Sequence, residues 1–273
     1  MKHINILIVF LTTLLLSSCE DVVQVDLKTD SPKLVIEASI NWYKNTIGNR
    51  QTIKLTTTTN YYDNLIPVVS GATVLITNAT NATFIFTEAQ QTGEYICTNF
   101  IPKIGETYTL TILNAGQTYY ATETMKSIAP IREIIQNNEG GFTGNNIEIK
   151  TYYTDPANES NYYLYKYSYS NQVTQNFYTD EDTFFQGNLF FSISQSDNLK
   201  VGDEVIVTHY GISKQYYNYM NVLVSIAGGN GGGPFQSPPA TVRGNITNTT
   251  NKDNYPLGYF SLSEVDTKTY TIQ

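Results

Sequence analysis

Short stretches of alternating apolar and polar residues fill the first half of the chain. Ile53 and Leu55 fall on one face of an extended segment, and residues 107–112 alternate strictly. Alternation with a period of two predicts half-buried β-strands, and the turn residues between the stretches predict short connections. The predicted strands cover residues 34–40, 51–58, 72–77, 82–86, 94–98, 107–112 and 118–122. About seven closely spaced strands indicate an immunoglobulin-like β-sandwich over residues 33–127.

The pattern becomes looser after residues 127–131, where Pro130 restricts Ala129 to an extended conformation. We expect the chain to leave the first sandwich there and to form a second β-rich domain over residues 128–273. Its predicted strands are 147–153, 163–169, 190–193, 205–210, 258–262 and 268–272. Apolar residues at helical spacing predict one helix near residues 213–226, with Ser213 as its cap.

The first 18 residues have a different pattern, which is typical of a cleavable export signal. A basic start at Lys2 precedes a short apolar run, which is too short for a membrane-spanning helix of roughly 20 residues. The run ends in Leu16-Ser17-Ser18-Cys19, an order that fits a signal peptidase cutting before a lipidated cysteine. We therefore predict a lipoprotein signal peptide over residues 1–18 and acyl chains on Cys19, which anchor the chain to a membrane.

Residues 19–32 read as the lipidated cysteine and a tether. The acidic pair Glu20 and Asp21 resembles the surface-export signal of Bacteroidetes lipoproteins, and a solvated acidic tether is the alternative. We expect an outer-membrane location at the cell surface, with the periplasmic face as the other possibility.

The charge balance argues against two classes of partner. With the leader and Lys2 removed, 15 basic residues stand against 24 acidic ones, a net charge of −9. Nucleic-acid binding and a polybasic grip on anionic lipid both need clustered Lys and Arg. We therefore expect no nucleic-acid partner.

No set of residues indicates catalysis, a metal or a cofactor. With Cys19 lipidated, Cys97 has no partner for a disulfide, and we expect it to be buried and catalytically idle. His209 lies in an apolar strand and reads as structural. Asp180, Glu181 and Asp182 lack the alternation of a calcium loop and read as a solvated acidic loop, although calcium binding stays open.

Two other features bear on binding rather than on chemistry. The glycine run 228–233 lacks the context of a phosphate loop and predicts a flexible loop after the helix. Tyrosine, present 22 times, offers an apolar ring with a polar tip, which suits sugars and protein partners. Adjacent tyrosines put rings on opposite faces of a strand, so one of each pair is a candidate for exposure. The candidate contact residues are Tyr162, Tyr163 and Phe235.

Taken in order, several segments resemble the Bacteroidetes outer-membrane lipoproteins of domain-of-unknown-function family 4249. The matching segments are Leu34-Val35-Ile36-Glu37, Leu55-Thr56 with Tyr61-Tyr62, Gly71-Ala72-Thr73-Val74, Gly93-Glu94-Tyr95, residues 105–110, Tyr120-Ala121, Ser237-Pro238-Pro239, Gly244-Asn245-Ile246 and residues 257–261. The resemblance implies no activity and no catalytic residues. It does imply an accessory role in uptake, because genes of the family often neighbour those of TonB-dependent receptors.

The expected function is therefore binding without catalysis. The first hypothesis is an accessory component of a TonB-dependent receptor or another outer-membrane β-barrel complex. The alternative is a surface carbohydrate-binding module that works alone and recognises a glycan; a peptide ligand also stays open. The sequence does not define the oligomeric state.

Overall fold

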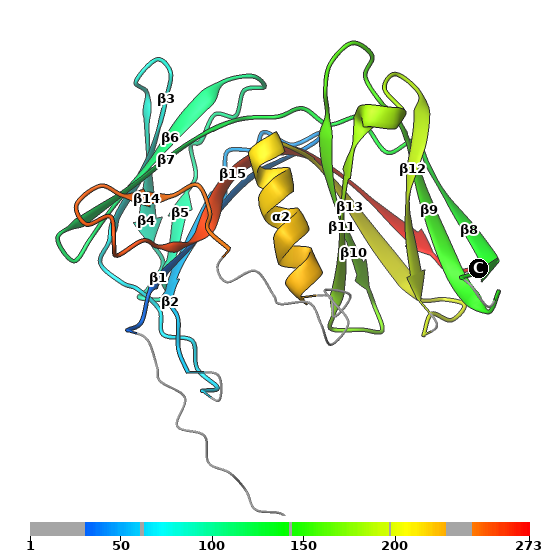
Figure 1. Cartoon of the computed structure of the whole chain (residues 1–273), viewed down its shortest axis with the longest axis horizontal. Coiled ribbons are helices and arrows are strands. Elements are labelled where there is room, and N and C mark those ends of the chain that lie inside the picture. Colours follow the sequence, from blue (N-terminus) through cyan, green and yellow to red (C-terminus); the bar gives the residue numbers. More distant parts are fainter. Residues whose placement is uncertain (1–30, 61–62, 142–143, 197, 228–241) are drawn as a thin grey trace, which may run out of the picture. The chain divides into compact units, whose positions relative to one another are not determined.

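The first half of the chain forms the predicted sandwich in the computed structural model (Figure 1). The structure describes residues 31–60, 63–141, 144–196, 198–227 and 242–273. All seven strands predicted there are present. They are β1 (Leu34–Tyr43), β2 (Gln51–Thr57), β3 (Thr73–Asn78), β4 (Thr83–Glu88), β5 (Glu94–Cys97), β6 (Thr107–Asn114) and β7 (Gln117–Thr124). Among the described residues, no helix combines the length and the apolar character that a membrane crossing requires.

These strands belong to one sheet that doubles back on itself, because β4 pairs with β5 on one side and with β3 on the other. Inward residues alternate with outward ones, as in β1, where Ile36, Ala38 and Ile40 are fully buried. Strand alternation of this kind places every second side chain in the core. The resulting core joins residues of all seven strands, including Phe84, Tyr108 and the buried free thiol of Cys97.

The end of the chain completes this first sandwich. The predicted strands 258–262 and 268–272 are one continuous strand, β15 (Leu257–Thr271). Its first part pairs in parallel with β1, from Val35 opposite Leu257 to Tyr43 opposite Val265. A short strand, β14 (Thr247–Asn248), pairs with β7. Ile246, Phe260 and Leu262 therefore lie in the core of the first sandwich.

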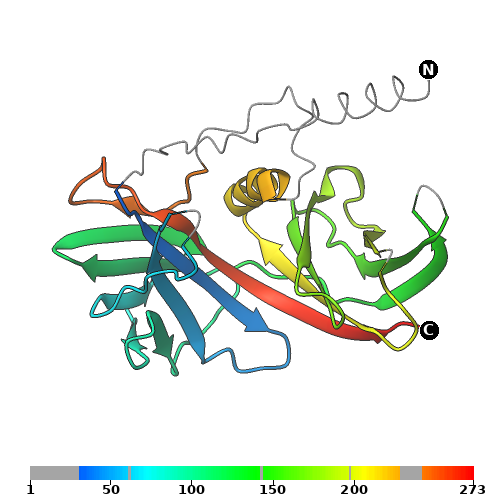
Figure 2. The ribbon, with the colours of Figure 1, turned by 90° about the horizontal axis from the view of Figure 1, so that it is seen from below.

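The second part of β15 belongs to the second half of the chain, where it pairs with β13 (Glu204–Ile212) (Figure 2). The other elements there are β8 (Glu133–Gly140), β9 (Asn146–Thr154), β10 (Tyr162–Tyr169), β11 (Gln175–Glu181), a 3-10 turn η1 (Asp182–Phe184), β12 (Leu189–Ser196) and the helix α2 (Lys214–Ala227). The strand order β11-β10-β13-β15 continues the large sheet, and β12-β9-β8 form a separate three-stranded sheet. The sequence pattern missed β8, β11 and β14.

Two apolar clusters lie on opposite faces of β10. Alternation sends the predicted row Tyr163, Tyr165, Tyr167 and Tyr169 into a core shared with β9, while Leu164 faces the helix. The helix begins where the sequence predicts, because the Ser213 hydroxyl accepts a hydrogen bond from the Tyr216 N–H (3.2 Å) and caps the first turn.

The predicted connection at residues 127–131 is held along β15. Glu264 accepts a hydrogen bond from the Ile128 N–H (2.9 Å), and Asp266 accepts one from the Ile131 N–H (2.7 Å). Ile128 and Ile131 are buried. Residues 32–273 form one compact unit. The division of the chain into domains 33–127 and 128–273 stays a prediction, and the structure adds that residues 246–265 supply strands and core residues to the first sandwich.

The acidic segment is not the solvated loop that the sequence indicates. Asp180 and Glu181 lie on β11, paired with Tyr163 and Tyr162. Asp182 is only 4% exposed, and its carboxylate accepts a hydrogen bond from the Asn161 N–H (2.8 Å). The sequence did not predict β11, because a strand this polar has no alternation of apolar residues and is stabilised by pairing with its neighbour.

We predict that Gly258→Ala destabilises the protein by several kcal/mol, because it disrupts the pairing of β1 with β15. Gly258 has φ of +97°, and a Cβ there would lie 2.0 Å from the Ile36 carbonyl oxygen. Gly202→Ala is the matched control, since Gly202 has φ of +93° with open space around it. The control should cost only the strain of positive φ, about 1 kcal/mol. Equal losses for both variants in chemical denaturation would contradict the pairing.

Candidate functional site

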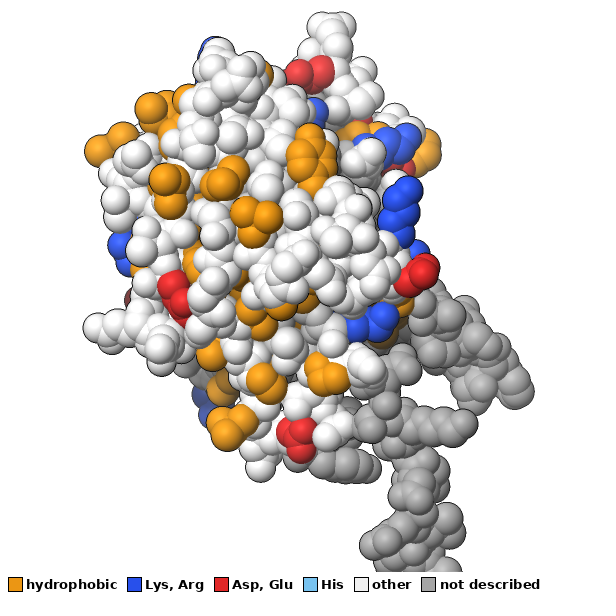
Figure 3. Space-filling view, turned by 90° about the vertical axis from the view of Figure 1, so that its left-hand side faces the viewer, with side chains coloured by type: hydrophobic (Ala, Val, Ile, Leu, Met, Phe, Trp, Pro, Cys, Tyr) orange, Lys and Arg blue, Asp and Glu red, His pale blue; other side chains and the backbone are white. Residues whose placement is uncertain are grey.

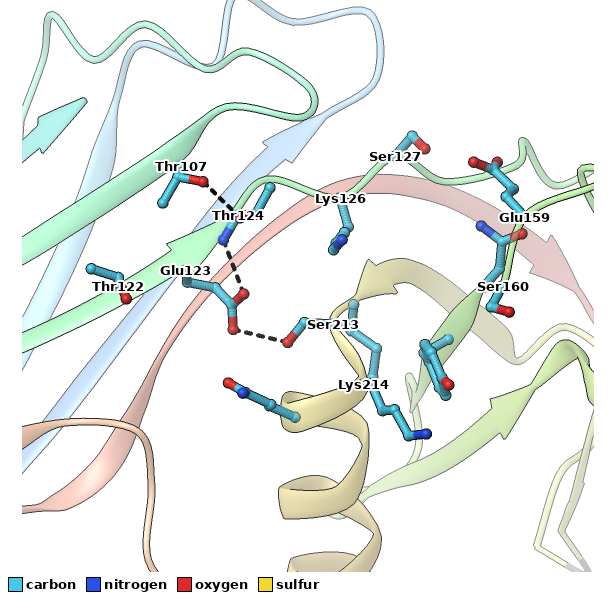
Figure 4. Close-up of a pocket in the computed structure, with 14 residues that line it drawn as sticks. Thr107, Thr122, Glu123, Thr124, Lys126, Ser127, Glu159, Ser160, Ser213 and Lys214 are labelled. Carbon is cyan, nitrogen blue, oxygen red and sulfur yellow. Dashed lines mark hydrogen bonds between the residues drawn. The ribbon is translucent and has the colours of Figure 1, made fainter. Parts of the chain in front are cut away.

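A polar cleft of about 450 Å³ lies between the first sandwich and the N-terminal end of α2 (Figure 4). Three parts of the chain line it: β6 and β7, the segment 126–127, and the turns that lead into β10 and α2. The lining residues used below are Glu123, Lys126, Asn161, Tyr162, Ser213 and Lys214. Since β14 pairs only with Tyr119 and Tyr120 of β7, the end of β7 beside the cleft is not covered by β14.

Glu123 is the central acid of the cleft and is only 9% exposed. Its carboxylate accepts hydrogen bonds from the Thr124 N–H (2.9 Å) and from the Ser213 hydroxyl (2.8 Å). Burial raises the pKa of Glu123, while these two donors and the charge of Lys126 oppose the rise. The carboxylate also faces the first turn of α2, where the helix dipole favours a negative charge. Glu123 thus ties the end of β7 to the start of the helix.

Ser213 has a positioning role. Its hydroxyl donates to Glu123 and accepts from the Tyr216 N–H, so both functions of the oxygen serve structure. A serine nucleophile needs a base that takes its proton and a free approach for the substrate.

The Asn161 Oδ1 atom is buried and has no hydrogen-bond partner among the described residues. The ammonium groups of Lys126 and Lys214 and the hydroxyl groups of the lining suit a ligand that offers both donors and acceptors.

Tyr162, one of the sequence candidates, lies in the cleft and is half-buried. Its ring packs on Tyr217 (centroids 5.3 Å apart), and the Lys214 ammonium lies 6.0 Å from its centre. The prediction of Tyr163 as a contact residue is wrong. Its side chain is only 1% exposed, and its hydroxyl donates a hydrogen bond to the buried carboxylate of Asp155. The strand alternation that exposes Tyr162 turns Tyr163 into the core. Phe235, Cys19 and the glycine run 228–233 lie outside the described residues.

His209 is structural in its surroundings but is not satisfied by hydrogen bonds. The ring is fully buried and stacks on Tyr165 at 4.6 Å, with Tyr153 and Tyr163 nearby. Neither ring nitrogen has a hydrogen-bond partner among the described residues. Burial lowers the pKa of His209 to about 3, opposed by the Ala129 backbone. The histidine is therefore neutral in the folded protein.

The structure confirms that Cys97 is buried. Its thiol is 1% exposed, and burial raises the pKa of the thiol. A thiol that is both buried and protonated is a poor nucleophile. Among the residues that the structure describes, no group of three or more His, Cys, Asp or Glu is arranged to hold a metal ion.

A second surface with a distinct composition covers the outer face of β3, β4, β6 and β7, and we call it the threonine face. Its outward residues are Thr73, Leu75, Thr77, Thr83, Ile85, Thr87, Thr107, Thr109, Thr111, Leu113, Thr118, Tyr120, Thr122 and Thr124. None of them is charged. Figure 3 shows the side of the molecule where these strands lie, and uncharged side chains fill its centre.

Pairing register aligns the threonine face into rows across the strands. Thr83, Thr77, Thr109 and Thr122 form one row across four strands. Ile85, Leu75, Thr111 and Tyr120 form the neighbouring row. Neighbouring strands are about 4.8 Å apart, so hydroxyl groups recur at that spacing. Sequence reasoning missed this face, because it depends on which strands are neighbours.

The chain belongs to a family of unknown function: the domain of unknown function DUF4249 matches residues 20–269. Among proteins of curated function, none matches the sequence.

Several solved structures are similar to the chain at low sequence identity. A two-domain fibronectin type-III segment of chicken tenascin is 12% identical, with a TM-score of 0.22, and the match covers 67% of this chain and 91% of that one. The FN1-FN3 domains of chicken CNTN1 are 10% identical, with a TM-score of 0.22 and coverage of 67% and 60%. A cytokine receptor complex gives 10% identity, a TM-score of 0.25 and coverage of 68% and 86%. Scores this low support no argument about function.

We predict that stability decreases with acidity through His209. The pKa is about 3 in the folded state and about 6.5 in the unfolded state. Between these values the unfolded state binds more protons, so the free energy of unfolding falls as pH falls, by up to about 1.4 kcal/mol per unit. His209→Leu should flatten the dependence in denaturation curves recorded from pH 7 to about pH 4. An identical slope in both proteins would contradict the assignment.

We also predict that Ser213→Ala costs about 1–3 kcal/mol, since it removes a helix cap and a donor to a buried carboxylate. The pKa of Glu123 should rise further, as followed by carboxyl NMR titration. Ser225→Ala, at an exposed hydroxyl of the same helix, is the control and should change stability by less than about 0.5 kcal/mol. Equal losses of stability for the two substitutions would contradict the assignment of Ser213 as the cap of α2 and the donor to Glu123.

Proposed function

We propose that this protein is a lipid-anchored component of the outer membrane that acts by binding, as an accessory to a TonB-dependent receptor or another β-barrel complex. Two sequence observations support the location: the order Leu16-Ser17-Ser18-Cys19 after a short apolar run, and the acidic pair that follows it. Membership of the family is compatible with this proposal, and its Bacteroidetes and lipoprotein character is part of what we propose.

The observation that carries the binding role is the cleft at the start of α2. Its lining offers hydroxyl groups and two lysines, and a half-buried tyrosine lies beside them. Mixed donors and acceptors of this kind suit the backbone and polar side chains of a loop from a protein partner. Anchoring raises the effective concentration of the protein near a membrane partner, so a small interface is sufficient.

The partner segment would enter the cleft as an extended loop, with Tyr162 as its main contact. Tyrosine is enriched among residues whose truncation weakens protein interfaces. Packing on Tyr217 restrains the ring of Tyr162 in the cleft, so little side-chain entropy is lost on binding. Lys126 and Lys214 would meet carbonyl oxygens or an acidic residue of the loop.

The threonine face favours the second candidate, a surface carbohydrate-binding module. Neutral glycans offer many hydroxyl groups and apolar ring faces, and the face offers rows of hydroxyl groups with one exposed ring, Tyr120 (42% exposed). The absence of charge from its outward residues fits a neutral ligand. Glycan binding would then centre on Tyr120 and its threonine rows, whereas Thr107, Thr122 and Thr124 lie where the face meets the cleft.

The test is recovery of a barrel protein by the full-length chain. After mild detergent extraction, quantitative mass spectrometry should find an outer-membrane β-barrel with the wild type. Tyr162→Ala should reduce its recovery about tenfold or more, as expected for an interface residue worth about 2 kcal/mol. Tyr120→Ala is the matched control and should leave recovery unchanged.

Cys19→Ala should abolish acyl labelling and membrane retention in the same cells. Recovery of the chain alone under several gentle conditions, with glycan binding that Tyr120→Ala removes, would favour the carbohydrate-binding module instead. Turnover of a glycan or peptide by the purified protein would overturn both proposals.

A further inference from the structure

One end of the first sandwich carries a run of exposed apolar residues, the segment Leu65-Ile66-Pro67-Val68. Leu65 is 83% exposed, Ile66 66% and Val68 46%, and Pro67 is exposed as well. Single exposed apolar residues are ordinary on protein surfaces. Four in succession are a liability for a soluble surface unless they serve a contact. We call this run the apolar loop.

The apolar loop has a defined backbone, which keeps its side chains from folding into the core. The Thr57 N–H donates to the Pro67 carbonyl (2.9 Å), and the Val69 N–H donates to the Leu55 carbonyl (3.0 Å). At the start of the segment, Asp63 accepts hydrogen bonds from the Thr59 hydroxyl (2.6 Å) and the Asn60 N–H (3.2 Å). These hydrogen bonds anchor both ends of the loop, so its exposed state is built into the fold.

The loop lies at the end of the sandwich where the chain enters β1. The Thr58 N–H donates to the Lys33 carbonyl, and the Lys33 N–H donates to the Thr58 hydroxyl, each at 2.9 Å. Thr58, which precedes the apolar loop in the chain, therefore lies beside Lys33, just before β1. In Figure 1 this loop, drawn in cyan, and the dark-blue start of β1 lie at the same lower end of the sandwich.

Two cations surround an aromatic ring at this same end. The Lys33 ammonium lies 3.8 Å from the centre of the Tyr255 ring, and the Arg243 guanidinium lies 4.0 Å from it. Cations and tyrosine rings are favourable at the level of lipid headgroups. Acidic groups are also close: Glu88 accepts from the N–H groups of Gly71 and Gly93, and Asp63 is tied to Thr59. The apolar residues and not a net positive charge must therefore supply most of the attraction.

From these observations we propose that the apolar loop inserts into the headgroup region of the membrane to which the protein is anchored. The inference rests on the proposed lipid anchor, which puts only residues 20–31 between the membrane and the sandwich. At full extension 12 residues span roughly 40 Å, so the sandwich stays near the lipid surface. Leu65 and Ile66 then enter the boundary between headgroups and acyl chains, as apolar residues of interfacial proteins do.

The experiment uses the chain from Glu20 onward, which lacks the leader and the lipidated cysteine but contains the compact unit of residues 32–273. Its partition onto vesicles is measured by co-sedimentation, with pure phosphatidylcholine in one series and a mixture of phosphatidylethanolamine and phosphatidylglycerol in the other. Leu65→Ser with Ile66→Ser should lower the partition coefficient at least about tenfold in both series, because each side chain loses a favourable transfer from water.

Ile85→Ser is the matched control, because Ile85 is also 66% exposed but lies on the threonine face. It should leave partition unchanged. Equal partition of the wild type and the double variant would overturn the inference. The inference would also fail if the wild type bound only the anionic vesicles and the double variant kept that binding.

Failure of the inference is distinguishable from failure of the proposed function. Acyl labelling of the full-length wild type tests the anchor separately, and recovery of a barrel protein tests the binding role. If the double variant loses recovery of the barrel but keeps vesicle partition, the loop is a protein contact and the lipid proposal is wrong.

Discussion

The pairing of β1 with β15 is the interaction on which the rest of the structure depends. A parallel pair requires a long connection, and here that connection is nearly the whole chain, since Val35 lies opposite Leu257. The same strand then pairs with β13, so it has one part in each half of the molecule. Carboxylates of Glu264 and Asp266 on that strand also hold the segment 128–131. The two halves are therefore joined by backbone pairing as well as by a linker.

This joining gives the cleft its shape. Glu123 comes from the first sandwich and Ser213 from the second half, and a 2.8 Å hydrogen bond connects them. If the two halves moved freely, this contact would break and the buried carboxylate would lose a donor, which is costly. A cleft with fixed walls is preorganised, so a partner pays less conformational entropy on binding.

Much of the fold follows from local sequence patterns, whereas the site does not. The seven strands of the first half, the tyrosine row of β10 and the cap at Ser213 were all predictable, because each depends on alternation or on a local hydrogen bond. β11 was missed since its stability comes from its neighbour β10. The role of β15 was missed because no local pattern tells which distant strand a segment joins. For the same reason neither Glu123 nor the threonine rows were predictable, and Tyr162 was identified together with its buried neighbour Tyr163.

The most direct test is whether the two halves unfold together. Trp42, the single tryptophan, lies on β1 and reports on the first sandwich through its fluorescence. Amide exchange of β9 and β10 during the same denaturant titration reports on the second half. The shared strand predicts coincident transitions with one midpoint, as for a single cooperative unit. Two separate midpoints, with the first sandwich intact after β9 and β10 have unfolded, would contradict the account.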